Sequence, residues 1–271
     1  MGPIGIFDSG YGGLTILKDI REKLPAYDYL YLGDNARAPY GPRSFDVVYQ
    51  YTLEAVKELF SRGCPLVILA CNTASAKALR SIQQNDLPTI APDKRVLGVI
   101  RPSTEIIGQY SRSKAIGILA TEGTVASESY VIEIKKFWPQ CSVVQHACPL
   151  WVPLIENNEF HTHAGREFIE KDVQALLQKN PRIDTIVLGC THYPVLQEYI
   201  ESIVPEGVKV VSQGSIVAES LADYLLRHPW MDSKLSRNGS VHYLTSESTD
   251  VFNKQASEFM GSSVAATHIV L

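Results

Sequence analysis

Two cysteines, Cys71 and Cys190, stand at matching places in the chain, each directly after a short apolar run and before small polar residues. A thiol has an ordinary pKa of about 8.5, and helix N-termini and neighbouring side chains can draw it towards neutrality. Two such groups on opposite faces of one carbon suit a reaction that removes a proton from one face and returns one to the other. The pattern therefore predicts racemisation or epimerisation.

Two titratable residues accompany the thiols at the same class of strand end. Asp8 follows the apolar run 4–7, and His192 follows Cys190 by two residues. A carboxylate and an imidazole are groups that shift the pKa of a nearby thiol, so we expect each to tune the nearer sulfur. Further polar residues near these ends are candidates for binding a substrate: Ser9, Asn72, Thr73, Thr121, Thr124 and Thr191.

Two more segments supply candidate contacts. Tyr40 and Gly41 lie in a Pro- and Gly-rich loop, and we expect the Tyr40 hydroxyl and the Gly41 N–H to face an anionic substrate tail, although a plain turn is the default for such residues. Glu156 occupies a comparable region of the second half, where a surface carboxylate is the ordinary alternative.

The cysteines also have other interpretations. An isolated cysteine at a strand end is usually a small buried hydrophobe, and we assign that role to the other three, Cys64, Cys141 and Cys148. Cys71, Cys190, His192 and Asp8 are all acceptable zinc ligands, but their spacing matches no usual local pattern. We expect no metal. The glycine-rich turn 10–13 lacks the third glycine of a dinucleotide fingerprint, and we expect it to let the backbone approach a carboxylate.

The elements that position these residues alternate between strands and helices, which predicts parallel α/β sheets. The expected strands are 4–7, 29–32, 66–70, 96–100, 115–120, 142–146, 185–189, 208–211, 241–245 and 265–271. The expected helices are 14–24, 48–60, 125–138, 166–179, 216–226 and 249–260, with a polar loop over 228–239.

The strand-and-helix rhythm occurs twice. Residues 5–9 resemble 117–121, and residues 66–73 resemble 184–192, at similar separations. We therefore predict two pseudo-symmetric α/β domains with mostly parallel sheets and an active site in the cleft between them. The last segment is too short for a third domain, so we expect it to pack on the first half. The predicted domains are 1–98 plus 212–271, and 99–211.

Composition excludes several classes of protein. The chain has 271 residues, of which 45% are hydrophobic and 20% charged, typical of a globular protein. No apolar run reaches the length of a membrane span, and nothing resembles a signal peptide, so we expect a cytoplasmic protein. The net charge is −4 without a basic stripe, so we expect neither nucleic acid nor membrane as a partner. Five irregularly spaced cysteines indicate thiols rather than disulfides.

The sequence resembles the glutamate racemases of the Asp/Glu racemase family over nearly the whole chain. The resemblance is carried by six motifs: Ile6-Phe7-Asp8-Ser9-Gly10-x-Gly12-Gly13, Tyr31-Leu32-Gly33-Asp34 with Pro39-Tyr40-Gly41, Ala70-Cys71-Asn72-Thr73-Ala74-Ser75, Gly117 to Thr124 with Ser127, Cys148-Pro149-Leu150 with Pro153-Leu154 and Glu156, and Leu188-Gly189-Cys190-Thr191-His192-Tyr193-Pro194. Related aspartate racemases usually have glutamate at position 192, so His192 favours glutamate. Residues 211–214 depart from the family pattern.

The resemblance implies a cofactor-independent two-base racemase that interconverts L- and D-glutamate, D-glutamate being needed for bacterial peptidoglycan. It implies that Cys71 acts on the D-enantiomer and Cys190 on the L-enantiomer. Racemases of this family are often homodimers. In this family the substrate site is lined by the residues at the following positions: Asp8, Ser9, Tyr40, Gly41, Asn72, Thr73, Thr191 and His192.

Three alternatives stay open. The first is an aspartate or other amino-acid racemase of the same family. The second is a two-lobed receptor that binds an amino acid without converting it, and the third is a thiol hydrolase with one nucleophilic cysteine.

Overall fold

The structure, a computed structural model, describes all residues from Met1 to Leu271 and divides ten strands between two sheets. The larger sheet has the order β10-β9-β2-β1-β3-β4 and the smaller one β6-β5-β7-β8, and every neighbouring pair is parallel. The strands are β1 (Ile4–Asp8), β2 (Tyr29–Gly33), β3 (Leu66–Leu69), β4 (Arg95–Gly98), β5 (Ala115–Ala120), β6 (Ser142–Ala147), β7 (Thr185–Gly189), β8 (Lys209–Val211), β9 (Val241–Thr245) and β10 (Ala266–His268).

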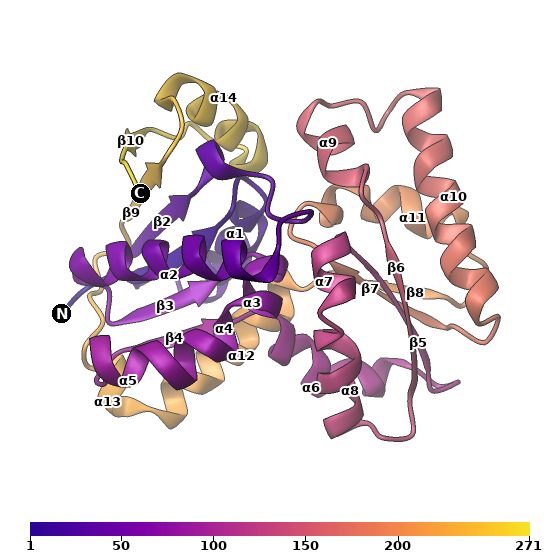
Figure 1. Cartoon of the computed structure of the whole chain (residues 1–271), viewed down its shortest axis with the longest axis horizontal. Helices are drawn as coiled ribbons and strands as arrows, with labels where there is room; N and C mark the ends of the chain where they lie inside the picture. Colours follow the sequence, from indigo (N-terminus) through magenta and orange to yellow (C-terminus); the bar gives the residue numbers. More distant parts are fainter.

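The two sheets share one topology. The order β2-β1-β3-β4 in the first unit is repeated as β6-β5-β7-β8 in the second, with the strands taken in the same sequence along the chain. The similar segments found in the sequence fall on corresponding strands, β1 with β5 and β3 with β7. The predicted pair of pseudo-symmetric α/β units is therefore confirmed, and Figure 1 shows them side by side.

Helices connect the strands. The first unit and its tail contain α1 (Gly13–Lys23), η1 (Asn35–Arg37), α2 (Phe45–Ser61), α3 (Asn72–Lys77), α4 (Leu79–Ser81), the π-helical η2 (Ile82–Asp86), α5 (Leu87–Ile90), α12 (Gly214–Arg227), α13 (Pro229–Asp232) and α14 (Thr249–Met260). The intervening part contains α6 (Ile100–Tyr110), α7 (Glu122–Ala126), α8 (Ser129–Phe137), α9 (Trp151–Glu156), α10 (His163–Lys179), η3 (Tyr193–Leu196) and α11 (Gln197–Ile203).

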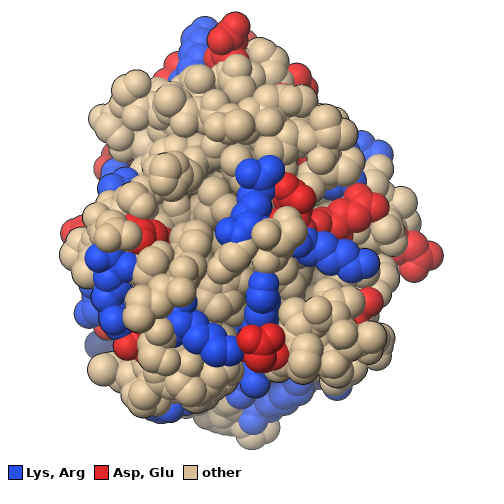
Figure 2. Space-filling model, turned by 90° about the vertical axis from the view of Figure 1, so that its left-hand side faces the viewer, with Lys and Arg blue, Asp and Glu red and all other residues tan.

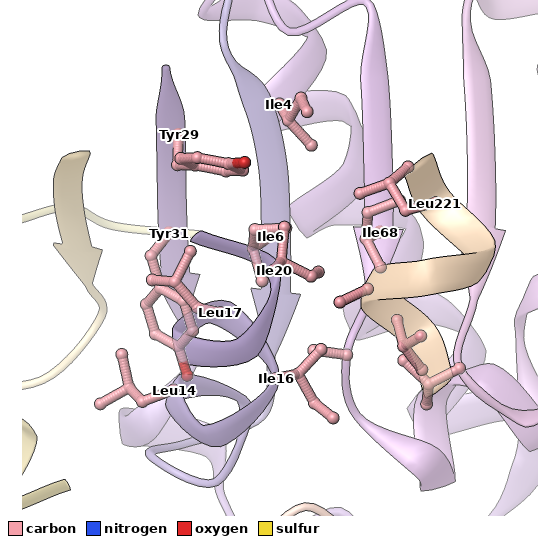
Figure 3. Packing of buried hydrophobic residues seen from close by; sticks show 14 of the residues in the cluster. Ile4, Ile6, Leu14, Ile16, Leu17, Ile20, Tyr29, Tyr31, Ile68 and Leu221 are labelled. Atoms are coloured by element: carbon pink, nitrogen blue, oxygen red, sulfur yellow. The ribbon is translucent and has the colours of Figure 1, made fainter. Parts of the chain in front are cut away.

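The core of the first unit explains why β1 holds its position. Strand β1 is buried along its whole length, and its Ile4 and Ile6 pack against α1. Leu221 of α12 belongs to the same cluster of buried side chains (Figure 3). Apolar residues of α1 recur at helical spacing, with Leu17 and Ile20 fully buried. Each such side chain contributes roughly 1.5–3 kcal/mol through burial, which fixes the carboxyl end of β1.

Four sequence predictions differ from the structure. The helix expected over 125–138 is divided into α7 and α8, because Glu128 adopts a left-handed backbone with φ of 54°. The expected strand 265–271 is paired only over Ala266–His268. The loop 228–239 contains the short helix α13, and the strand expected over 96–100 ends at Gly98 because α6 begins at Ile100.

The tail returns to the first unit, as predicted, because β9 pairs with β2 and adds β10 at the edge. Both chain ends consequently lie on the same lobe (Figure 1). We propose domain boundaries at 98–99 and 211–212, where β4 and β8 end. Gln213 lies in the segment that departs from the family pattern, and its amide donates to the Val99 carbonyl oxygen and to the Ser103 hydroxyl. It therefore links the two segments by which the chain passes between the units.

Charges are mixed on the surface. On the face in Figure 2, Lys and Arg side chains lie among uncharged residues, and acidic side chains are next to several of them. None of the helices combines the length and apolar character needed to cross a membrane.

Candidate active site

The carboxyl ends of the central strands of both sheets border one small cavity. Its volume is about 30 Å³, and it is lined by residues from both units. The lining residues are Ser9, Gly10, Ala38, Pro39, Tyr40, Gly41, Cys71, Asn72, Thr73, Thr121, Val152, Glu156, Cys190, Thr191 and His192. Eleven of the predicted site residues are in this set; Asp8 and Thr124 are not.

Cys71 lies on the wall formed by the first unit. It is the N-cap of α3, and its Sγ accepts from the Ala74 N–H at 3.5 Å and lies 3.5 Å from the Ser9 hydroxyl. Burial, and after it the nearby Asp8 carboxyl, raise the pKa of this thiol to about 12. The expectation that neighbours draw the pKa towards neutrality is therefore wrong for Cys71 in the free protein, because two weak hydrogen bonds do not offset burial.

Cys190 lies on the wall formed by the second unit and has an imidazole beside it. The Nδ1 of His192 is 3.9 Å from the Cys190 Sγ, and its Nε2 is 2.9 Å from Oε1 of Glu156. Burial by itself lowers the pKa of His192, but the hydrogen bonds to Cys190 and Glu156 outweigh it and raise the pKa to about 10. His192 is thus positioned to hold a positive charge next to the sulfur, as predicted, and Glu156 holds the imidazole.

Asp8 lies behind the cavity rather than in its lining. Its carboxylate accepts from the Gly10 N–H at 2.9 Å and from the Thr191 hydroxyl at 3.4 Å, so it links the two units. Burial raises its pKa, while His192 and the hydrogen bonds act in the opposite direction. The glycine-rich turn approaches this carboxylate and the second unit: a Cβ on Gly12 would lie 2.3 Å from the Thr191 hydroxyl oxygen and 2.5 Å from Nδ1 of His192.

Asn72 offers an unused donor. Its Oδ1 accepts from the Tyr130 hydroxyl at 2.7 Å, which fixes the amide, and its buried Nδ2 has no partner. On the opposite wall the backbone N–H groups of Thr191 and His192 donate to no backbone acceptor. Buried donors without partners are costly, which makes these groups well suited to an anionic ligand.

Three threonines join the walls. The hydroxyl groups of Thr73 and Thr121 are 2.9 Å apart, and that of Thr124 is 3.0 Å from that of Thr121. Thr121 is the N-cap of α7 and reaches the cavity, whereas Thr124 is fully buried behind it. Thr124 therefore supports Thr121 and has no exposed surface for direct contact with a ligand.

The loop between β2 and α2 closes one side of the cavity. Tyr40 is buried, and its hydroxyl donates to Asp34 at 2.5 Å. In this arrangement the Tyr40 hydroxyl does not donate to a substrate as predicted, because its hydrogen is already bonded to the Asp34 carboxylate. Gly41 lies against Thr121 of the other unit, and its N–H donates to no backbone acceptor.

Sequence reasoning missed four lining residues. Gly10, Ala38 and Pro39 are neighbours of predicted residues, while Val152 comes from α9, one turn before Glu156. The helical spacing of Val152 and Glu156 is a signal that could have found the valine. No group of three or more His, Cys, Asp or Glu side chains is arranged to hold a metal ion. All five cysteines are free thiols.

Fold and site together define an α/β protein with two repeated units and a thiol on each wall of the cavity between them. The Asp/Glu/Hydantoin racemase family model matches residues 4–221, and the chain belongs to that family. The glutamate racemase of Roseobacter denitrificans is 40% identical over 95% of this chain and 96% of its own length.

Solved structures agree with this assignment. A glutamate racemase isoform from Bacillus anthracis has a TM-score of 0.90 at 31% identity, covering 100% of this chain and 98% of its own. The glutamate racemase of Francisella tularensis, solved in complex with D-glutamate, has a TM-score of 0.84 at 28% identity, covering 100% of this chain and 97% of its own.

Proposed function

We propose that this protein is a glutamate racemase, an isomerase that interconverts L- and D-glutamate by two-base proton transfer without a cofactor and supplies D-glutamate for peptidoglycan. The observation that carries the proposal is the pair of thiols, Cys71 and Cys190, which line one small cavity from opposite units. A carbon held between them has an acid/base group available on each face.

The thiolate of one cysteine takes the α-proton and becomes a thiol, and the two electrons of the C–H bond remain on the substrate. The thiol of the other cysteine then gives its proton to the opposite face and becomes a thiolate. By the family resemblance, Cys71 removes the proton from D-glutamate and Cys190 removes it from L-glutamate. The two thiols exchange protonation states in each turnover.

The difficult step is to stabilise negative charge that develops next to the α-carboxylate. The Asn72 amide and the N–H groups of Thr191 and His192, which donate to no backbone acceptor, are available as donors for that carboxylate. Donors fixed before reaction, in a site from which water is excluded, stabilise such charge more than mobile water does. The substrate ammonium also introduces a positive charge, which lowers the pKa of a nearby thiol such as Cys71.

The alternatives differ in what they predict. Glutamate is favoured over aspartate because the full-length relatives are glutamate racemases and His192 occupies the second motif. A two-lobed receptor needs a ligand cavity but has no need for an imidazole at a cysteine. A thiol hydrolase uses one cysteine and leaves the other idle.

We further propose glutamate as the small-molecule partner, a homodimer as the assembly and the cytoplasm as the location. The first rests on the D-glutamate complex of the Francisella relative, and the other two on the family resemblance. Sedimentation velocity of the purified protein tests the assembly. Growth of a D-glutamate auxotroph that expresses the chain tests the supply of D-glutamate.

The decisive experiment follows the optical rotation of L-glutamate in deuterium oxide with no added cofactor, with aspartate in parallel. The rotation of L-glutamate is expected to fall to zero while the α-hydrogen is replaced by deuterium, and aspartate is expected to react far more slowly. Binding of glutamate without loss of rotation would support the receptor instead. Faster reaction of aspartate would move the assignment to another racemase of the family.

A further inference from the structure

Lys77 is a buried charged side chain without an acidic partner. It is the last residue of α3, the helix that Cys71 caps, and only 9% of it is exposed. No ion pair of the protein includes it. Burial lowers the pKa of its ammonium group, and no carboxylate acts against that. Because an unpaired buried charge costs free energy, its position calls for a specific partner.

The partner is the loop that closes the cavity. The Lys77 ammonium group donates to the carbonyl oxygen of Arg43, and its Nζ lies 5.0 Å from the centre of the Phe45 ring. A carbonyl dipole and the face of an aromatic ring both attract a cation. These two contacts place the Lys77 charge where the loop 38–44 meets the start of α2.

The second unit reaches the same point. A Cβ on Gly123, in the first turn of α7, would lie 2.8 Å from the Lys77 Nζ and 2.6 Å from the Gly41 carbonyl oxygen. Only glycine fits there, so the backbone of α7 lies directly against both groups. Thr73, one turn before Lys77 in α3, is hydrogen-bonded to Thr121 at the same seam. Lys77 thus lies where α3, the loop and the second unit meet.

The loop has few other links to α3. Its first part is held by the bond from Tyr40 to Asp34, and the Arg43 side chain donates only to carbonyl oxygens of residues 37 and 39, at or next to the loop itself. Residues 38–41 nevertheless form a side of the cavity. The hydrogen bond from the Lys77 ammonium group to the Arg43 carbonyl oxygen connects α3 to the end of this loop that precedes α2.

We propose that Lys77 is a positioning residue whose ammonium group fastens the loop 38–44 between the Cys71 helix and the second unit, and thereby holds the cavity wall in place for the substrate. The consequence for catalysis rests on the proposed glutamate racemase function. The consequence for the loop does not, because it concerns the free protein alone.

The test compares Lys77→Met, which keeps the packing of the stem and removes the charge, with Lys77→Arg, which keeps the charge. Lys171→Met is the matched control, since Lys171 is exposed on α10 and has no ion-pair partner. For Lys77→Met we expect the KM for glutamate to rise about three- to tenfold with kcat changed less than about twofold, the size of effect that one charged hydrogen bond supports. Lys77→Arg restores KM, and Lys171→Met leaves it unchanged.

A second measurement uses the loop directly. Trypsin cuts after Arg43 when the loop leaves its place, and the fragment that begins at Ser44 is followed by mass spectrometry. We expect faster release of this fragment from Lys77→Met than from the wild-type protein or from the control, with Lys77→Gln replacing it where Lys77→Met does not fold.

Unchanged KM and unchanged cleavage after Arg43 in a folded variant would overturn the proposal. A fall in kcat alone that Lys77→Arg fails to restore would also overturn it, since that pattern indicates packing only. If the wild-type protein lacks racemase activity, the proposed function fails, and the cleavage experiment still decides whether Lys77 holds the loop.

Discussion

The two walls of the cavity are built from the same repeated unit, yet they treat their cysteines differently. On the first wall Cys71 has a hydroxyl and one backbone N–H near its sulfur, and its pKa is raised to about 12. On the second wall Cys190 has His192 beside it, whose pKa is raised to about 10 by Cys190 and Glu156. The backbone is repeated, but the charge environment is not.

This difference indicates that the two sulfurs depend on different sources of positive charge. On the second wall a positive charge on His192 lies next to the Cys190 sulfur before any ligand arrives. Cys71 has no such partner, and Asp8 acts against its ionisation. Its thiolate therefore depends on a positive charge brought by the ligand, such as an amino acid's ammonium group. The free protein thus has a cation beside the sulfur on one wall and none beside the sulfur on the other.

The largest expected effect removes a thiol from either wall. Cys71→Ala and Cys190→Ala are each expected to lower racemisation by about 10⁴-fold, because a racemase needs an acid/base group on both faces. Glutamate binding, measured by calorimetry, is expected to remain. Cys141→Ala serves as the control, since that thiol is buried away from the cavity. Near-normal turnover in both directions by either single variant would contradict the two-base proposal.

The next effect concerns the imidazole. His192→Asn is expected to lower kcat/KM by about 10²- to 10³-fold. Because the enantiomers of free glutamate have equal free energy, this fall is the same in both directions. The asymmetry appears in isotope effects: α-deuterated L-glutamate is expected to show a larger increase in its primary isotope effect than the D-enantiomer. Equal increases would mean that His192 does not act through Cys190.

A smaller change tests the charge of Glu156. Glu156→Gln keeps a hydrogen-bonding group at His192 and removes the negative charge, so the pKa of His192 is expected to fall from about 10 towards its ordinary value. The titration of the imidazole is followed by NMR, with Glu159→Gln, an exposed neighbour, as control. In the wild-type protein, the stability contributed by this raised pKa is present below about pH 6.5 and is lost as the pH rises through about 10. An unchanged titration would show that the charge of Glu156 does not raise the pKa of His192.

The smallest effect lies on the Cys71 wall. Tyr130→Phe removes the hydrogen bond that fixes the Asn72 amide, and the KM for glutamate is expected to rise about two- to tenfold, with a smaller change in kcat. Tyr199→Phe, which loses a bond to Glu170 on the surface of the second unit, is the control and is expected to leave KM unchanged. Equal effects of the two substitutions would show that Asn72 does not orient the substrate.

Much of the fold was predictable because its signals are local. Apolar runs of four to six residues gave the central strands, and Cys71 and Cys190 were found because each directly follows such a run. The break between α7 and α8 was not predictable from periodicity, because it depends on the left-handed backbone of the single residue Glu128. Residues 72–90 form short helices and a π-helical segment without a clear apolar period.

The sequence by itself determined which residues stand at the ends of the strands, because a strand and the polar residues that follow it are neighbours in the chain. It also determined that the unit is repeated. Only the tertiary structure decided the environment of each side chain: that Tyr40 bonds to Asp34, that Asp8 lies behind the cavity, and that Lys77 meets Gly123. These contacts join residues far apart in the chain, and burial and distance to charge, which set each pKa, exist only after the two units pack together.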